Sequence, residues 1–118
     1  MNTADKVIDV LTRADLSRMR APIMAEAVGL KCRRVLEKKL ISEGTCYREL
    51  LREERMKRCR DMLGRNPRID GHGLARKCGY TAAAQLYRAF HAWFNVSLHQ
   101  VKHCGGDIQG IGIYDKTE

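Results

Sequence analysis

The 118-residue sequence predicts an all-α fold in which two helix-turn-helix subdomains are joined by one long helix. Apolar residues recur at steps of three and four along most of the chain, which is the spacing of one buried helix face. Glycines stand where these periodic stretches stop, as expected where a chain leaves a helix with positive φ. The third observation is an internal repeat at a fixed offset of 50 residues.

The first helix is expected from Thr3 to about Arg13. Thr3 is a suitable N-cap, and Val7, Ile8 and Leu11 follow at the spacing of one buried face. The next stretch, up to residue 20, shows no clear periodicity. We interpret the first helix as a support for the elements that follow.

A second helix should begin near Pro22, because proline suits the first turn, and should end at Gly29. From here the chain can be compared with itself. Five positions recur in the same roles 50 residues later: Met24, Ala25, Gly29, Leu36 and Leu40 correspond to Leu74, Ala75, Gly79, Leu86 and Phe90. Because the agreement includes both turn glycines, it indicates that one helix-turn-helix unit occurs twice.

A long linker helix should separate the two units. Gly44 stops the preceding helix, Thr45 can cap the next, and apolar spacing then continues from Cys46 through Leu63. Eighteen residues at ~1.5 Å each span roughly 27 Å, comparable with the ~34 Å between successive major-groove faces of DNA. The expected organisation is a first subdomain at 1–44, the linker helix at 45–64, a second subdomain at 65–104 and a flexible tail at 105–118.

The second unit shows its start and stop signals most clearly. Gly79 ends its first helix, and Thr81 can cap the next, whose apolar positions are Leu86, Ala89, Phe90, Trp93 and Phe94. Ser97 followed by Gln100 has the spacing of a capping box for a short last helix. Gly71 and Gly73 both disfavour helix, so the first helix of this unit should be short.

At these residues the chain resembles the AraC/XylS transcription regulators. The matching positions are Leu74-Ala75, Gly79-Tyr80, Leu86, Arg88, Phe90, Trp93-Phe94 and Val96-Ser97, and in the linker Arg55-Met56, Cys59 and Met62-Leu63. The resemblance covers about residues 3–102. Asn95 replaces the usual glycine, Leu98 the usual proline, and Gly71 an apolar residue, while Lys31-Cys32 stand where the first unit often has serine.

The net charge of +8 predicts an anionic partner. Twelve basic and six acidic residues lie between 31 and 65, and five basic and one acidic between 66 and 104.

The five cysteines are scattered without a C-x-x-C pair, which favours reduced thiols in the cytoplasm. We expect no metal, no cofactor and no membrane segment, and no enzyme, because nucleophile–base pairs and phosphate loops are missing.

A helix in the major groove presents its exposed, N-terminal half to the base edges. The candidates in the first unit are Arg33, Arg34, Glu37 and Lys38. Arg34 and Lys38 could donate to guanine, and Glu37 could accept from cytosine or orient the two cations. The alternative is a solvated charged stripe with an internal ion pair.

The candidates in the second unit are Ala83, Ala84, Gln85, Tyr87 and Arg88. The alanines can touch thymine methyl groups, Gln85 or Tyr87 could reach a base edge, and Arg88 a base or phosphate. Tyr87 could instead belong to the core. Phosphate contacts are assigned to Thr45, Thr81, Ser97 and Lys102, although helix capping explains the hydroxyl groups equally well.

The function that follows is a sequence-specific DNA-binding transcription regulator of the bacterial or phage type. The resemblance implies a stand-alone domain that binds double-stranded DNA as a monomer and activates transcription by contacting RNA polymerase. The alternative is an interaction protein of the same fold that occupies a partner regulator or polymerase subunit, or a repressor or antagonist. The role of the tail at 105–118 stays open.

Overall fold

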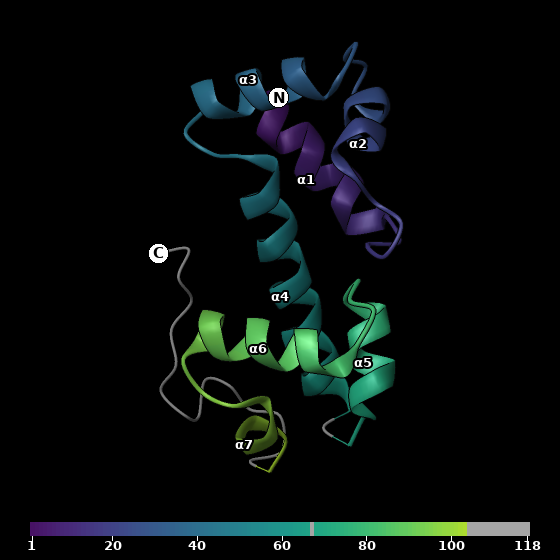
Figure 1. The fold of residues 1–118 in the computed structure, drawn as a ribbon, viewed down its shortest axis with the longest axis vertical. Helices are drawn as coiled ribbons and strands as arrows, with labels where there is room; N and C mark the ends of the chain where they lie inside the picture. The colour runs from purple at the N-terminus through teal and green to yellow at the C-terminus, as the bar shows by residue number, and fades with distance from the viewer. Residues whose placement is uncertain (67, 104–118) are drawn as a thin grey trace. The chain divides into compact units, whose positions relative to one another are not determined.

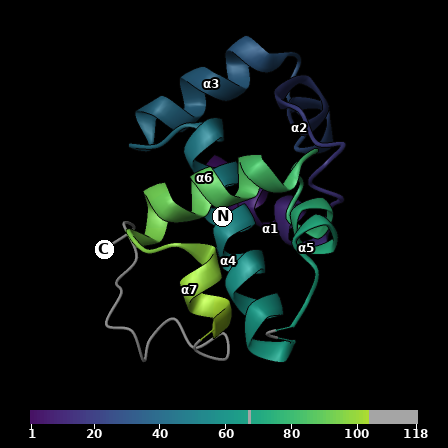
Figure 2. The same ribbon diagram turned by 60° about the horizontal axis from the view of Figure 1, so that its bottom comes forward.

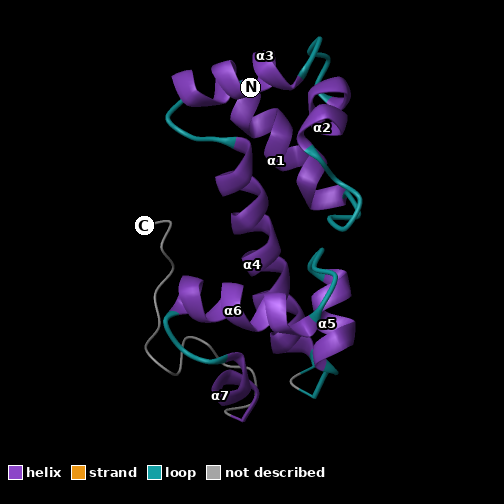
Figure 3. Ribbon diagram, in the orientation of Figure 1, coloured by secondary structure: helices purple, strands orange, loops and turns teal. Residues whose placement is uncertain are grey.

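The computed structural model describes residues 1–66 and 68–103, and the side chains of residues 1–66 and 68–100. Every regular element in this part is a helix, so the predicted all-α class is confirmed (Figures 1 and 3). The helices are α1 Thr3–Arg13, α2 Ala21–Ala27, α3 Arg33–Ser42, α4 Tyr47–Arg65, α5 Gly71–Lys77, α6 Ala83–Phe94 and α7 Leu98–His103.

The chain divides into two compact units within α4. The first unit is Met1–Glu54, and the second begins at Arg55. The N-terminal part of α4 packs Tyr47 and Leu50 into the first core, and its C-terminal part packs Cys59 and Leu63 into the second. The long helix is therefore a structural member of both units, and it begins one residue later and ends two residues later than its apolar spacing predicts.

The first unit is built from α1, α2, α3 and the start of α4. Its buried apolar residues are Val7, Leu11, Leu16, Met24, Ala25, Leu36, Leu40, Tyr47 and Leu50. Ile8 is 42% exposed, so its assignment to the buried face of α1 was wrong. That face consists of the buried Val7 and Leu11, with Ala4 and Val10 packed partly against the core. Leu16, which comes from the stretch without periodicity, is buried in the core.

The N-terminus of α1 is held by two side chains rather than by Thr3, the cap expected from the sequence. The Oδ1 of Asn2 accepts from the Asp5 N–H at 2.8 Å. Glu43, forty residues away, accepts from the Thr3 N–H at 3.2 Å and the Ala4 N–H at 2.8 Å. These bonds satisfy donors that have no partner inside a helix, and they hold the pKa of Glu43 below its ordinary value.

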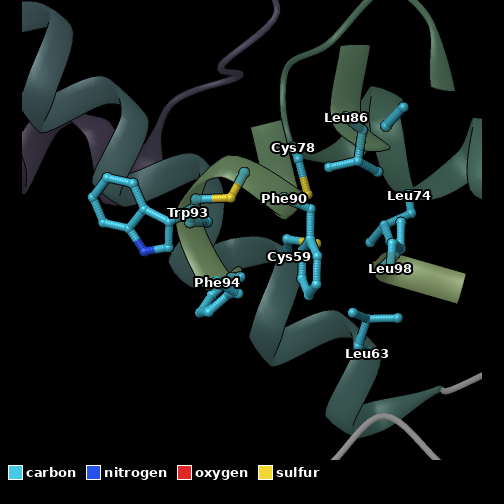
Figure 4. Packing of buried hydrophobic residues seen from close by; sticks show 11 residues of the cluster. Cys59, Leu63, Leu74, Cys78, Leu86, Phe90, Trp93, Phe94 and Leu98 are labelled. Carbon is cyan, nitrogen blue, oxygen red and sulfur yellow. The ribbon is translucent and has the colours of Figure 1, made fainter. Parts of the chain in front are cut away.

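In the second unit α5, α6 and α7 enclose a core against the C-terminal part of α4 (Figure 2). The core contains Met56, Cys59, Leu63, Leu74, Ala75, Cys78, Leu86, Phe90, Trp93, Phe94 and Leu98 (Figure 4). Cys59 and Cys78 are both buried in this core. A hydrogen bond to Cys78, together with burial, raises the pKa of Cys59 far above that of a free thiol. The Cys59 thiol is thus a protonated, unreactive packing group in the folded protein.

The start of α7 is formed as the sequence predicts. The Ser97 hydroxyl accepts from the Gln100 N–H at 3.1 Å, which confirms the cap of α7. Asn95, which replaces a glycine of the AraC/XylS pattern, ends α6 with φ 60° and ψ 28°. Asparagine tolerates this left-handed conformation better than other residues with a side chain, so the substitution preserves the turn.

The predicted tail at 105–118 lies outside the described residues, as do Cys104 and the side chain of Lys102. Among the helices that the structure describes, none combines the length and the apolar character needed to cross a bilayer.

Candidate nucleic-acid interface

The turn between α2 and α3 is closed by two backbone hydrogen bonds around Gly29. Gly29 has φ 81°, and its N–H donates to the carbonyl of Glu26 at 3.0 Å. The N–H of Leu30 donates to the carbonyl of Ala25 at 2.8 Å. This pair of bonds defines a Schellman helix ending, in which glycine avoids the steric cost of positive φ. The turn fixes the direction in which α3 departs.

The turn between α5 and α6 repeats the same atomic pattern 50 residues later. Gly79 has φ 92° and donates to Arg76 at 3.1 Å, and Tyr80 donates to Ala75 at 2.8 Å. α2 packs on α3 and α5 packs on α6, and α2 and α5 each contain seven residues. The repeat that the sequence indicates is therefore confirmed as two structurally equivalent helix-turn-helix units.

Helix α3 buries Leu36 and Leu40 and exposes a strongly cationic face. Its exposed cations are Arg33, Arg34, Lys38 and Lys39. Lys39 is an exposed cation that was not among the residues expected from the sequence. Glu37 is half-buried, and its Oε1 lies 4.0 Å from the Nε of Arg33. Glu37 is thus paired with Arg33, and Arg34 and Lys38 lie exposed beside that pair.

The start of α3 carries an exposed thiol. Cys32 is the N-cap, although its side chain makes no hydrogen bond that closes the cap. The N–H groups of Val35 and then Arg34 lower the pKa of the Cys32 thiol, and the charges of Arg34 and Lys31 add to this effect. The beginning of the candidate reading helix is therefore an electropositive environment.

Helix α6 presents a less charged face. Ala84, Gln85 and Arg88 are exposed, Ala83 is half-buried, and Tyr87 is 42% exposed. Arg88 is thus the only cation among the expected contacts of α6, whereas three of the four expected contacts of α3 are cations. The two reading faces differ in charge despite their equivalent backbones.

Tyr87 turns back toward α5 from its exposed position on α6. Its hydroxyl oxygen lies 2.5 Å, and its Cζ 3.3 Å, from the place that a β-carbon on Gly71 would occupy. The phenol therefore fills the space left by the missing side chain of Gly71, where the AraC/XylS pattern has an apolar residue. Tyr87 therefore packs against α5 of its own unit, but at 42% exposure it is not part of the second core.

Two expected hydroxyl caps are wrong. The N-cap of α6 is Ala82, and Thr81 instead donates to the Gln85 side chain from its N–H and from its hydroxyl. α4 begins at Tyr47, so Thr45 lies too far ahead to cap it. The Thr45 N–H donates to the carbonyl of Leu40 at 3.0 Å and so completes the end of α3.

An open groove of about 450 Å³ lies between α6 and α7. Its lining is mostly apolar and comes from Tyr87, Arg88, His91, Ala92, Ser97, Leu98 and His99. The groove places His91 and His99, which were not among the residues expected from the sequence, beside Arg88. Helical spacing could have found His91, because it follows Arg88 by three residues on the same helix.

A cation–π contact joins α4 to the turn of the second unit. The Arg55 guanidinium lies 4.8 Å from the ring centroid of Tyr80, which follows the turn glycine Gly79. Burial raises the pKa of Tyr80, and the positive charge of Arg55 opposes that rise. The contact links α4 to the turn that orients α6.

In the described residues no group of three or more His, Cys, Asp and Glu side chains is arranged to hold a metal ion.

No model of a known protein family matches the chain. Solved structures do match it. A DNA-binding transcriptional dual regulator from Escherichia coli K-12 has a TM-score of 0.80 at 21% identity, covering 89% of this chain and 93% of that chain. The transcriptional regulator CdpR from Pseudomonas aeruginosa has a TM-score of 0.77 at 24% identity, covering 86% of this chain and 31% of that chain.

A third structure is the C-terminal domain of AraT, a response regulator from Geobacillus stearothermophilus, with a TM-score of 0.76 at 19% identity over 86% of this chain and 84% of that domain. The proteins differ in length, and CdpR is about three times as long as the region that matches. At these identities the likeness establishes the fold. The chain has the same double helix-turn-helix fold as these three regulators.

Proposed function

We propose that the protein is a sequence-specific DNA-binding transcription regulator that reads the major groove with α3 and α6. The observation that carries this proposal is the pair of equivalent turns at Gly29 and Gly79, each of which presents one exposed helix face. A helix-turn-helix places its second helix in the major groove. The DNA-binding regulators with the same fold support this assignment.

The charge distribution supports the same conclusion. The exposed face of α3 carries Arg33, Arg34, Lys38 and Lys39. Cations of this kind replace the counterions condensed on DNA, so the binding free energy becomes less favourable as salt concentration rises. Of the proposed phosphate contacts, the Ser97 hydroxyl already accepts from Gln100, which leaves its O–H to donate.

The experiment is fluorescence anisotropy with labelled duplex DNA over a range of salt concentrations. The proposal expects the logarithm of the binding constant to fall linearly with the logarithm of salt concentration. Absence of duplex binding at low salt would contradict the proposal. Salt-insensitive capture of a polymerase subunit without DNA binding would instead favour the interaction protein of the same fold.

We further infer from the resemblance to the short AraC/XylS proteins that the regulator is a monomeric activator that contacts RNA polymerase. Its division into a first subdomain at 1–44, a linker at 45–64 and a second subdomain at 65–104 belongs to the same proposal. Transcription with purified polymerase on a template carrying a selected site tests activation, and sedimentation of the DNA complex tests the stoichiometry. Repression of the template would contradict the activator role.

A further inference from the structure

Thr81, just before α6, and Gln85, in its first turn, form a hydrogen-bonded pair that occupies the amide oxygen of Gln85. The Oε1 of Gln85 accepts from the Thr81 N–H at 3.1 Å and from the Thr81 hydroxyl at 2.9 Å. Both residues are exposed. Gln85 is the third residue of α6, and Ala82 at the N-cap offers no side-chain acceptor. Gln85 therefore reaches back from the third helical position to the residue before the N-cap, much as the glutamine of a capping box reaches back to the N-cap itself.

The identity of the contacting atom follows from the chemistry of Thr81. A backbone N–H can only donate, so the amide group of Gln85 must face it with the oxygen. A carbonyl oxygen has two lone pairs, and the two bonds from Thr81 use both. The polar group of Gln85 that remains for a ligand is the NH₂ group, which only donates.

Glutamine ordinarily recognises adenine by accepting from N6 and donating to N7 at once. With its oxygen occupied by Thr81, Gln85 cannot accept from a base. In the major groove guanine presents two adjacent acceptors, O6 and N7, and thymine presents the acceptor O4. Adenine presents the acceptor N7 beside an amino group, and cytosine presents an amino group. A donor-only side chain therefore pairs with every polar group of guanine and thymine, whereas adenine offers it N7 alone and cytosine offers it no acceptor.

Resting on the proposed function of α6, we propose that Gln85 is a specificity-determining residue that selects a keto base, guanine or thymine, and that Thr81 sets this selectivity. The internal repeat limits the feature to the second unit. The corresponding positions of the first unit are Lys31 and Val35, and valine has no acceptor for such a bond. The two reading helices thus start with different chemistry on equivalent backbones.

The test is selection of preferred sites from random duplex DNA with the wild-type protein and three variants. Gln85→Ala identifies the base position that Gln85 contacts, because the preference there is lost. Thr81→Val keeps the shape of the side chain but removes the hydroxyl donor, which releases one lone pair of Oε1. Thr81→Ser is the matched control, because it keeps the hydroxyl. Thermal unfolding of each variant verifies that the exposed substitutions leave the fold intact.

We expect the wild-type protein to favour guanine or thymine over adenine and cytosine at that position by roughly fivefold or more, the lower end of a base-edge contact. Thr81→Val gains affinity for adenine there, and Thr81→Ser keeps the wild-type preference. Adenine or cytosine preferred by the wild-type protein, an unchanged profile in Thr81→Val, or no position that responds to Gln85→Ala would each overturn the inference. In all three cases duplex binding persists, which separates this failure from a protein that binds no DNA at all.

Discussion

The hydroxyl oxygen of Tyr87 lies 2.5 Å from the position that a β-carbon on Gly71 would occupy. The two residues belong to α6 and α5, and Gly71 is buried. A second glycine of α5, Gly73, has no atom within 4 Å of the corresponding position. The two glycines therefore look alike in the sequence but have different structural roles.

The first prediction uses this contrast. Gly73→Ala should raise the free energy of unfolding by about 0.5–1 kcal/mol, because alanine favours helix and meets no neighbour. Gly71→Ala should lower it by ~1 kcal/mol or more, because its β-carbon must displace the Tyr87 ring. Urea denaturation of the two variants measures both changes.

A double variant shows whether the phenol causes the loss. Tyr87→Phe removes the oxygen nearest to the new β-carbon, so Gly71→Ala should cost less in the Tyr87→Phe background than in the wild type. An equal cost in both backgrounds would show that Gly71 is required for another reason.

The fold could be predicted because its signals are local. The turn glycines Gly29 and Gly79 are needed for positive φ, and the apolar positions of α3 and α6 follow helical spacing. Their recurrence at one offset made the prediction stronger than either unit alone. The exposed cations of α3 follow from the same periodicity.

The features that could not be predicted depend on contacts between distant residues or on competition between caps. The contact between Glu43 and the N-terminus of α1 spans forty residues, and Leu16 is buried in the first core although it lies outside the helices. Thr81 is a good cap by type, but Gln85 competes for it. Residue type alone does not decide which of two local hydrogen-bond partners is used.

The second prediction concerns pH. Backbone N–H groups of Ala4 and Thr3 lower the pKa of Glu43 from its ordinary 4.5. Because the pKa of Glu43 is lower in the folded protein than in the unfolded one, its carboxylate contributes fully to the free energy of unfolding above the unfolded-state pKa. This contribution is lost as pH falls through the folded-state pKa. Glu43→Gln should therefore melt below the wild type at pH 7, and the difference should shrink below about pH 4.5. Scanning calorimetry between pH 7 and pH 3 measures this difference.

Glu26→Gln provides the control, because Glu26 is an exposed carboxylate on α2. Its melting temperature should follow that of the wild type across the range. If the melting temperature of Glu43→Gln lay below that of the wild type by the same amount at every pH, the shape of the Glu43 side chain, and not its charge, would hold the N-terminus of α1.

The third prediction concerns the thiols. The pKa of Cys32 is lowered by the Val35 and Arg34 N–H groups, so its thiolate persists at lower pH than that of an ordinary cysteine. Of the cysteines in the described part of the chain, iodoacetamide should label Cys32 ahead of the half-buried Cys46, while Cys59 reacts only after unfolding. Peptide mass spectrometry at pH 6–8 assigns each rate, and faster labelling of Cys46 at pH 7 would contradict the effect.

The fourth prediction separates base contacts from phosphate contacts on α3. Arg34→Ala or Lys38→Ala should weaken the preference for a selected site over random DNA by ~1–3 kcal/mol for each base edge that is left without its partner. Lys6→Ala on α1 is the control, because it removes an exposed cation outside the candidate surface. Equal weakening on selected and random DNA would reassign Arg34 or Lys38 to the phosphates.

The last prediction is an unequal division of sequence readout between the two units. The exposed face of α3 carries Arg34 and Lys38. The exposed face of α6 carries Ala84, Arg88 and Gln85, and the amide oxygen of Gln85 is occupied by Thr81. Methyl contacts discriminate between bases less than paired hydrogen bonds do, so the second unit should favour A·T-rich or deformable steps around the position that Gln85 contacts.

Sites selected from random DNA should therefore contain one block of strongly preferred bases, the sharp block, and one block of weakly preferred bases, the shallow block. Arg34→Ala should flatten the sharp block, and Arg88→Ala should flatten the shallow block and weaken overall affinity, because an arginine can hold phosphate as well as base. Two blocks of equal information, each abolished with the arginine of its own helix, would show that α6 reads bases as strictly as α3. The asymmetry inferred from the two exposed faces would then be wrong.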